Sequence, residues 1–125
     1  MKRLLIIIAL IVYITGLCFI DGILIEKKAE VMEEKLENIF FLAEEESPEL
    51  KNAVDDIESY WEENEFFFAA VTNHRLTDEL DENIGMLKHY VGINDEQHLM
   101  VKIAECRSKV QEIVKDDDFA WHNVF

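Results

Sequence analysis

The sequence is poor in the residues that mark several classes of protein. One Pro and four Gly among 125 residues exclude collagen-like and linker-type chains. Two Cys are too few for a disulfide-rich scaffold. Basic residues are scarce as well: 12 Lys and Arg stand against 27 Asp and Glu, for a formal net charge of −15. A chain this acidic has no basic stripe to neutralise phosphates, so we expect no nucleic-acid binding.

Half of the residues are hydrophobic, which excludes a disordered acidic tail, and they are unevenly spread. An unbroken uncharged run extends from Leu4 to Ile20, about 26 Å as a helix. Asp21 follows, and apolar residues then continue to Ile25. The segment from Leu4 to Ile25 is long enough to cross a membrane if Asp21 lies near the interface. Backbone groups in hydrocarbon must be satisfied internally, which predicts a transmembrane helix.

The charges beside this segment predict its orientation. Lys2 and Arg3 favour the cytoplasmic side, so we expect a membrane anchor over residues 1–25 and an extracytoplasmic acidic domain over residues 26–125. A cleaved secretory signal is the alternative, because it also begins with positive charges and an apolar core. The only passable cleavage site, around Cys18, lies inside the apolar run, which favours an uncleaved anchor. Both interpretations place the remaining chain outside the cell membrane.

Beyond the anchor, apolar residues recur at helical spacing in four segments. The first segment has no breaker between it and the anchor, so both are expected to form one helix. New helices are predicted to begin at Ser47-Pro48, at Thr77 and at Asn94. The short connections predict antiparallel neighbours, and the expected fold class is all-α: an N-terminal transmembrane helix followed by an antiparallel up-down helical bundle. The four apolar stripes are Ile25, Ala29, Met32, Leu36, Ile39 and Ala43; Leu50, Ala53, Val54, Ile57, Tyr60, Trp61, Phe67, Phe68 and Val71; Leu80, Ile84, Leu87 and Val91; and Leu99, Ile103, Cys106, Val110 and Ile113.

Signals for the helix ends are also present. Gly92 is a natural C-terminal stop for the third segment. Asn94 and Gln97 form a capping-box-like pair before the fourth. The three acids of residues 116–118 stand at the negative end of the last helix dipole and should help to end that helix. The aromatic tail that follows, residues 119–125, is expected to pack back onto the bundle.

Several short motifs stand out in this layout: Trp61, Asn73-His74, Asp78-Glu79-Leu80, Leu87-Lys88-Tyr90 and Asn123-Val124-Phe125. Together with the membrane helix behind Lys and Arg, they look like the bacterial, membrane-anchored family catalogued as "domain of unknown function 4363", small proteins of Gram-positive, Clostridia-like bacteria. Arg75 and Leu76 stand where we would expect a more acidic pair, which argues against a fixed charged site at that turn. The resemblance covers nearly the whole chain and implies fold and placement; it implies no activity and no catalytic residues.

The residues suggest no catalytic, cofactor or metal site. His74 and Asp78 are four residues apart, but the helix start expected at Thr77 separates them, so His74 should close a turn. The acids of residues 116–118 lack the Gly and the closing Glu of a calcium loop. Cys106 lies on an apolar stripe and is expected to be buried as a small hydrophobe. We therefore expect a non-enzymatic protein.

The aromatic residues are the sharpest feature. Helical spacing assigns most of them to the core, and the alternative is an exposed apolar patch that binds a partner. The function expected from the sequence is that of a single-pass membrane protein displaying an acidic interaction or structural domain, with another membrane or envelope protein as its partner. An extracytoplasmic sensor or a module that binds a ligand or cation is the alternative. The candidate patch consists of Trp61, Phe66, Phe67, Trp121 and Phe125.

Overall fold

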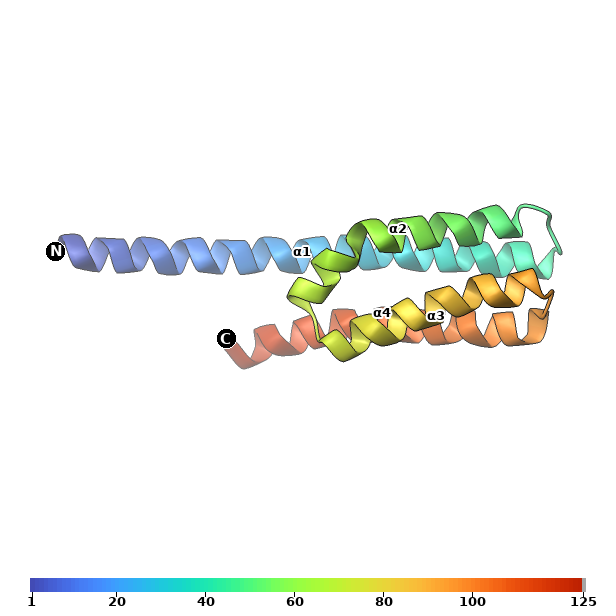
Figure 1. Ribbon diagram of the computed structural model, residues 1–125. Coiled ribbons are helices and arrows are strands. Elements are labelled where there is room, and N and C mark those ends of the chain that lie inside the picture. The colour runs from blue at the N-terminus through green and yellow to red at the C-terminus, as the bar shows by residue number, and fades with distance from the viewer. Residues whose placement is uncertain (125) are drawn as a thin grey trace.

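Four helices joined by short turns make up the protein, with each helix antiparallel to the one before it (Figure 1). The computed structural model describes the backbone of residues 1–124 and the side chains of residues 1–116. This confirms the all-α prediction and its up-down order, since no strand occurs among the described residues. The helices are α1 (Lys2–Glu44), α2 (Leu50–Val71), α3 (His74–Gly92) and α4 (Glu96–Val124).

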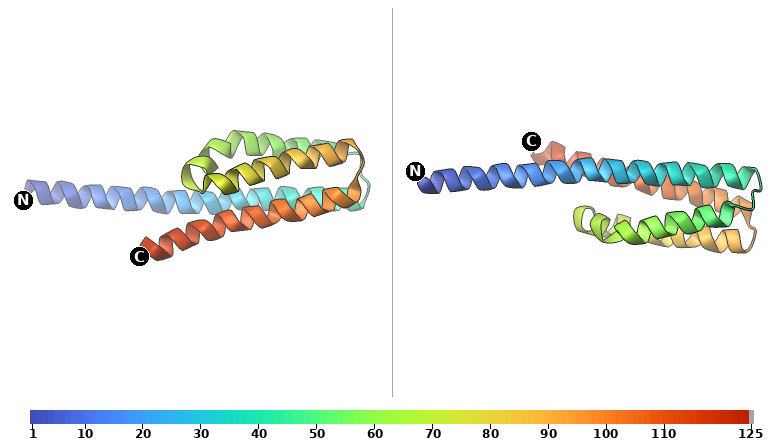
Figure 2. Two further views of the ribbon diagram at one scale, coloured as in Figure 1. Left: turned by 60° about the horizontal axis from the view of Figure 1, so that its bottom comes forward. Right: turned by 90° about the horizontal axis from the view of Figure 1, so that it is seen from above.

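The helices are arranged in a ring. Helix α1 packs against α2 and α4, and α3 packs against the same two, so that α1 and α3 lie diagonally across the bundle (Figure 2). The N-terminal part of α1 projects beyond the other helices (Figure 1). We call the end of the bundle at the α2–α3 turn the proximal end, because it faces this projecting part. The opposite end, with the α1–α2 and α3–α4 turns, is the distal end.

The core is built mainly from the stripes that the sequence predicts. All six stripe residues of α1 and all five of α4 are buried. Six predicted residues of α2 and α3 are only partly buried, and four buried residues of these helices lie outside the predicted stripes. The partly buried residues are Leu50, Ala53, Tyr60, Phe67, Val71 and Val91, and the additional buried residues are Asn64, Leu76, Thr77 and Asn83. The first buried residue of the chain is Ile25, so the core begins where the apolar N-terminal segment ends. Helix α2 contributes five buried side chains, and one of them is polar. The buried residues of α2 are Val54, Ile57, Trp61, Asn64 and Phe68.

The turn after α1 is stabilised by backbone hydrogen bonds. The amide of Ser47 donates to the carbonyl of Leu42 (3.0 Å), and the amide of Glu46 donates to that of Ala43 (3.2 Å). This pattern satisfies carbonyls that the helix end leaves free and requires a left-handed residue at its centre. Glu46 is that residue, with φ of 53°.

Helix α2 starts later than predicted. We expected it to begin at Ser47-Pro48, but it begins at Leu50. The backbone hydrogen bonds of the α1–α2 turn extend through Ser47, which delays the new helix. The Ser47 hydroxyl oxygen still accepts a hydrogen bond from the amide of Glu49 (3.3 Å), inside the turn and not at a helical cap.

Helix α3 starts one turn earlier than predicted. The expected start at Thr77 is wrong, because Asn73 caps the helix: its side-chain oxygen accepts from the amide of Arg75 (2.8 Å). Thr77 is instead a buried residue within the helix. Its hydroxyl lies 3.2 Å from that of Thr72, which connects the helix to the preceding turn.

The boundaries of α4 also differ from the prediction. Asp95 caps this helix in place of Asn94, since its carboxylate accepts from the amide of His98 (3.2 Å). Asn94 instead takes the left-handed position of the α3–α4 turn, with φ of 54°. The helix continues through the acids of residues 116–118 to Val124. An unfavourable charge at a helix end costs at most about 1 kcal/mol, which continued backbone hydrogen bonding outweighs.

Candidate functional site

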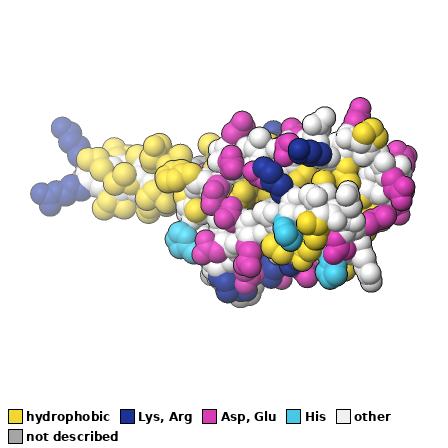
Figure 3. Space-filling model, turned by 45° about the vertical axis from the view of Figure 1, so that its right-hand side comes forward, with side chains coloured by type: hydrophobic (Ala, Val, Ile, Leu, Met, Phe, Trp, Pro, Cys, Tyr) yellow, Lys and Arg dark blue, Asp and Glu magenta, His cyan; other side chains and the backbone are white. Residues whose placement is uncertain are grey.

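The apolar N-terminal segment is the largest feature that the core leaves uncovered. Every side chain from Leu4 to Leu17 is exposed, and no residue before Ile25 is buried. Figure 3 shows this as a hydrophobic rod with Lys and Arg at its tip, in contrast to the acidic surface of the bundle. Among the described residues, α1 is the one helix that is long and apolar enough to cross a membrane.

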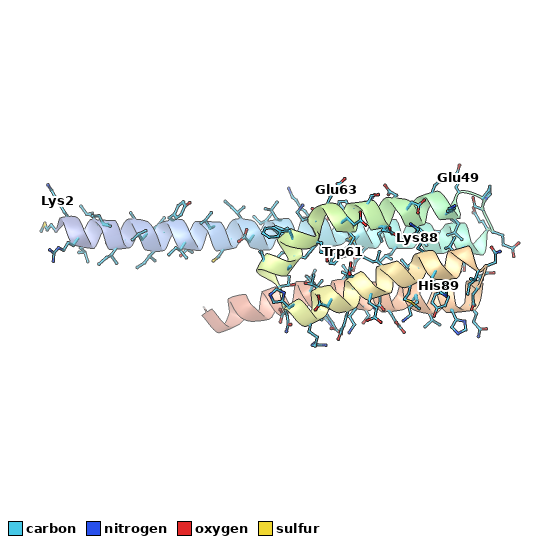
Figure 4. All side chains as sticks on the ribbon, viewed as in Figure 1. Lys2, Glu49, Trp61, Glu63, Lys88 and His89 are labelled. Carbon is cyan, nitrogen blue, oxygen red and sulfur yellow. The ribbon has the colours of Figure 1, made fainter. Side chains whose placement is uncertain are left out.

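Trp61 belongs to the core and not to an exposed patch. Its side chain is 1% exposed and stacks on Phe68, with ring centroids 5.6 Å apart. The indole N–H donates to a carboxylate oxygen of Asp81 on α3 (2.9 Å), between α2 and α3 (Figure 4). The carboxylate therefore satisfies the one polar atom of a buried side chain.

The other predicted patch residues differ in exposure. Phe66 is 86% exposed, whereas Phe67 is half-buried, edge-on to Phe68 and beneath the ammonium group of Lys28 (5.2 Å to the ring centroid). Trp121 and Phe125 lie outside the residues whose side chains are described, as does the predicted packing of the aromatic tail. A patch that includes Trp61 is therefore wrong, and Phe66 is its exposed member among the described side chains.

The distal end holds a groove that the sequence did not predict. Its volume is about 810 Å³, and it lies between the two distal turns, which are far apart in the chain. Apolar periodicity identifies the buried face of a single helix. This groove instead depends on which two turns meet in space, and periodicity does not predict that. Its lining carries charges of both signs. The lining residues are Ala43, Glu46, Ser47, Pro48, Leu50, Lys51, Val54, Asp55, Lys88, Tyr90, Val91, Gly92, Asn94, Asp95, Glu96 and Leu99.

Lys88 is one of the two lysines that line this groove. Its ammonium nitrogen lies 3.5 Å from a Glu58 carboxylate oxygen and 4.0 Å from one of Asp55, both on α2 (Figure 4). At the other wall, hydrogen bonds from His98 hold the pKa of Asp95 below its usual value. The ring of Tyr90 stacks on that of His98, with centroids 5.4 Å apart. The groove thus has a cation, a carboxylate and an aromatic wall with which to bind a small polar molecule.

A second charged group joins α3 to α4. Glu79 lies 2.7 Å from the ammonium of Lys109 and 3.0 Å from the guanidinium of Arg75. Hydrogen bonds from Lys109 and from Arg75 lower the pKa of Glu79. The hydrogen bond between Lys109 and Glu79 also raises the pKa of Lys109. The residue that the resemblance marked as a departure, Arg75, therefore stabilises the anion of Glu79.

Cys106 is buried, as predicted. Burial raises the pKa of its thiol to about 12, so the thiolate that acts as a nucleophile is scarce at neutral pH. His74 and Asp78 share α3, contrary to the expected break. Within the described part of the chain, however, no three His, Cys, Asp or Glu side chains converge to hold a metal ion.

The comparison with protein families gives one result. Residues 23–124 match the family described as "Domain of unknown function (DUF4363)". The chain belongs to this DUF4363 family. No curated protein and no solved structure matches the chain.

The DUF4363 match confirms the family resemblance seen in the sequence. It begins two residues before Ile25, the first buried residue, and so covers the helical bundle and excludes most of the apolar segment. The family description names a domain and gives no activity. The geometry of the bundle must therefore carry any functional conclusion.

Proposed function

We propose that this chain is a single-pass membrane protein of the DUF4363 family that displays an acidic helical domain outside the cytoplasmic membrane. The apolar surface from Leu4 to Leu17 carries this proposal, because it is exposed and continuous. Lipid is the solvent that such a surface fits, and a helix satisfies its backbone groups there. Lys2 and Arg3 favour a cytoplasmic N-terminus.

The proposed role of the domain is interaction or structure, without catalysis. Its partner would be another membrane or envelope protein. The support is physical: the core is filled by apolar side chains, and the single buried thiol has a raised pKa. Recovery of a specific partner from detergent-solubilised membranes is the expected result. Repeated recovery of the chain alone would refute the interaction role.

The topology has a separate test that uses thiol labelling of intact cells. In a Cys18→Ser background, Ser47→Cys at the distal end should react with a membrane-impermeant maleimide, because Ser47 lies in a turn far from the apolar segment. A cysteine inserted between Met1 and Lys2, which keeps both positive charges, should react only after the cells are permeabilised. The opposite pattern, or full-length chain in the soluble fraction, would refute the proposed placement.

The distal groove supports a second candidate function, that of a ligand-binding sensor. Its volume of about 810 Å³ is in the range of small-molecule sites. A ligand that binds this groove should raise the melting temperature saturably, as linkage requires. A cation is the weaker form of this candidate, since no three metal-ligating side chains converge among the described residues. Titration with Ca²⁺, Mg²⁺ and Zn²⁺ should be compared with Na⁺ at matched ionic strength. An equal response to all four ions reports charge screening and refutes a specific cation site.

A further inference from the structure

The two ends of the bundle differ in chemistry. The distal turns carry many acids: residues 44–46 are all Glu, and residues 95–96 are Asp-Glu. The proximal end is formed by the last turns of α2, where residues 66–71 are Phe-Phe-Phe-Ala-Ala-Val, and by the start of α3, where Asn73, His74 and Arg75 are exposed. Phe66 is 86% exposed, and Ala70, one helical turn later, is exposed as well. The exposed apolar side chains of α2 thus lie at one end of the molecule.

Contacts between α1 and α2 show which residues of α1 lie beside this apolar end. The ammonium of Lys28 contacts the side-chain oxygen of Asn64, and Lys35 pairs with Asp56 (2.5 Å). Antiparallel helices advance equally in opposite directions, so two residues beyond Asn64 on α2 correspond to two residues before Lys28 on α1. Phe66 therefore lies level with residue 26 of α1.

This level is close to the end of the apolar segment. Residue 26 is five residues beyond Asp21, about 8 Å along the helix axis. A headgroup layer is about 5–8 Å thick on each side of the hydrocarbon. Figure 1 shows that the α2–α3 turn lies near this level and that the C-terminal end of α4 extends still further toward the apolar segment. If Asp21 marks the edge of the hydrocarbon, the backbone of Phe66 lies at the outer edge of the headgroups, and Ala70 lies closer to the lipid.

We infer that the proximal end of the bundle docks on the bilayer that α1 crosses, with Phe66 and the exposed end of α2 in the lipid interface. The inference rests on the proposed function, since it requires α1 to span the membrane. It adds a second lipid contact, which would fix the bundle against the membrane surface. Aromatic side chains at the interface are a frequent means of such anchoring.

The charges near the proximal end indicate whether its contact with lipid is electrostatic or apolar. Glu62, Glu63 and Glu65 precede Phe66 on α2, and the guanidinium of Arg75 on α3 is paired with Glu79, so attraction to anionic headgroups does not hold this end on the membrane. Desolvation, with neighbouring carboxylates, already raises the pKa of Glu65. The contact is therefore apolar, and it should form on uncharged phosphatidylcholine and persist at high salt.

The test places a fluorophore on single thiols of the full chain. In a Cys18→Ser background, Phe66→Cys and the control Phe41→Cys are labelled and reconstituted into phosphatidylcholine vesicles that contain nitroxide-labelled lipid. Phe41 is a matched control because it is 53% exposed and lies 20 residues beyond Asp21, about 30 Å above the interface. Both phenylalanines are exposed, so their replacement leaves the core intact. Buried Cys106, with its raised pKa, should stay unlabelled.

The expected result is that lipid-borne nitroxide quenches the label at position 66 strongly and the label at position 41 little, with the same ratio at high salt. Equal quenching at the two positions would overturn the inference. So would a label at position 66 that is shielded from aqueous iodide without being quenched by lipid, because another protein surface would then cover it. The wild-type chain, labelled on Cys18, tests the proposed function separately. Quenching of this label by lipid-borne nitroxide reports that α1 lies in the bilayer, whatever the result at position 66.

Discussion

Replacement of Glu46 with Gly should stabilise the bundle. Glu46 holds a left-handed backbone conformation, with φ of 53°, at the centre of the α1–α2 turn. Its side chain is exposed and makes no packing contact that the replacement would remove from the core. The conformation places the Cβ atom of any L-residue close to its own carbonyl, and Gly alone avoids this strain.

The size of the gain follows from two opposing effects. Relief of the left-handed strain is worth about 1–2 kcal/mol. The greater freedom of Gly in the unfolded chain removes about 0.5–1 kcal/mol of that gain. The net stabilisation should lie between about 0 and 1.5 kcal/mol, and its mid-range value of about 0.75 kcal/mol corresponds to a rise of about 3–6 °C in the melting temperature for a domain of this size.

The assay is denaturant or thermal unfolding of the full chain in mild detergent, followed by far-UV circular dichroism and by the tryptophan fluorescence to which buried Trp61 contributes. Glu46→Ala is the matched control, because it removes the same charge but retains Cβ. Glu45→Gly is a second control, since Glu45 has ordinary helical φ of −81° and should lose stability. If Glu46→Gly is no more stable than Glu46→Ala, the argument from backbone strain is wrong.

Three further predictions concern buried or charged groups. Trp61→Phe leaves Asp81 without the indole donor and should lower the free energy of unfolding by about 1–2 kcal/mol, measured by denaturant titration. The Cys106 thiol, with its pKa near 12, should resist maleimide at pH 8 until denaturant unfolds the bundle, as followed by mass spectrometry. Lys109 lowers the pKa of Glu79 in the folded state, so this pair stabilises the protein above pH 4.5, and its contribution is lost as the pH falls through the lower folded pKa. Glu79→Gln should therefore weaken the fall in the free energy of unfolding between pH 4.5 and more acidic pH, measured by denaturant titration at each pH.

Each of these predictions has a clear contrary result. Equal stability of the wild type and Trp61→Phe would mean that the indole hydrogen bond contributes nothing net. Maleimide labelling of native Cys106 at the rate of unfolded chain would contradict its burial. An unchanged fall in the free energy of unfolding below pH 4.5 in Glu79→Gln would assign the pH dependence to other carboxylates.

Periodicity predicted the fold well because the core obeys one physical rule. Apolar residues three and four apart lie on one helix face, so the stripes from Ile25 to Ala43 and from Leu99 to Ile113 could be found without coordinates. The helix boundaries were less predictable. Asn73, Asp95 and Ser47 are all good capping residues, and the choice among nearby candidates depends on backbone hydrogen bonds formed across each turn.

The candidate sites were harder to predict than the core. Spacing identified Trp61 as apolar and helical, but only the partner Asp81, from another helix, explains why a side chain with a polar atom is buried there. The distal groove required two turns separated by more than 40 residues to meet in space. Phe66 differs from its neighbours Phe67 and Phe68 only in direction, which is set by the rotation of α2 against the bundle.

If α1 crosses a bilayer as proposed, its continuity would couple the orientation of the bundle to the thickness of that bilayer. A helix that crosses a membrane tilts by about 20° on average, and more when its apolar length exceeds that of the lipid. Glu44 lies 23 residues beyond Asp21 on this uninterrupted helix, so such a tilt moves the distal turns sideways by about 12 Å. A thicker or thinner membrane would thereby change where the groove points, with no hinge in the chain and no change in the core.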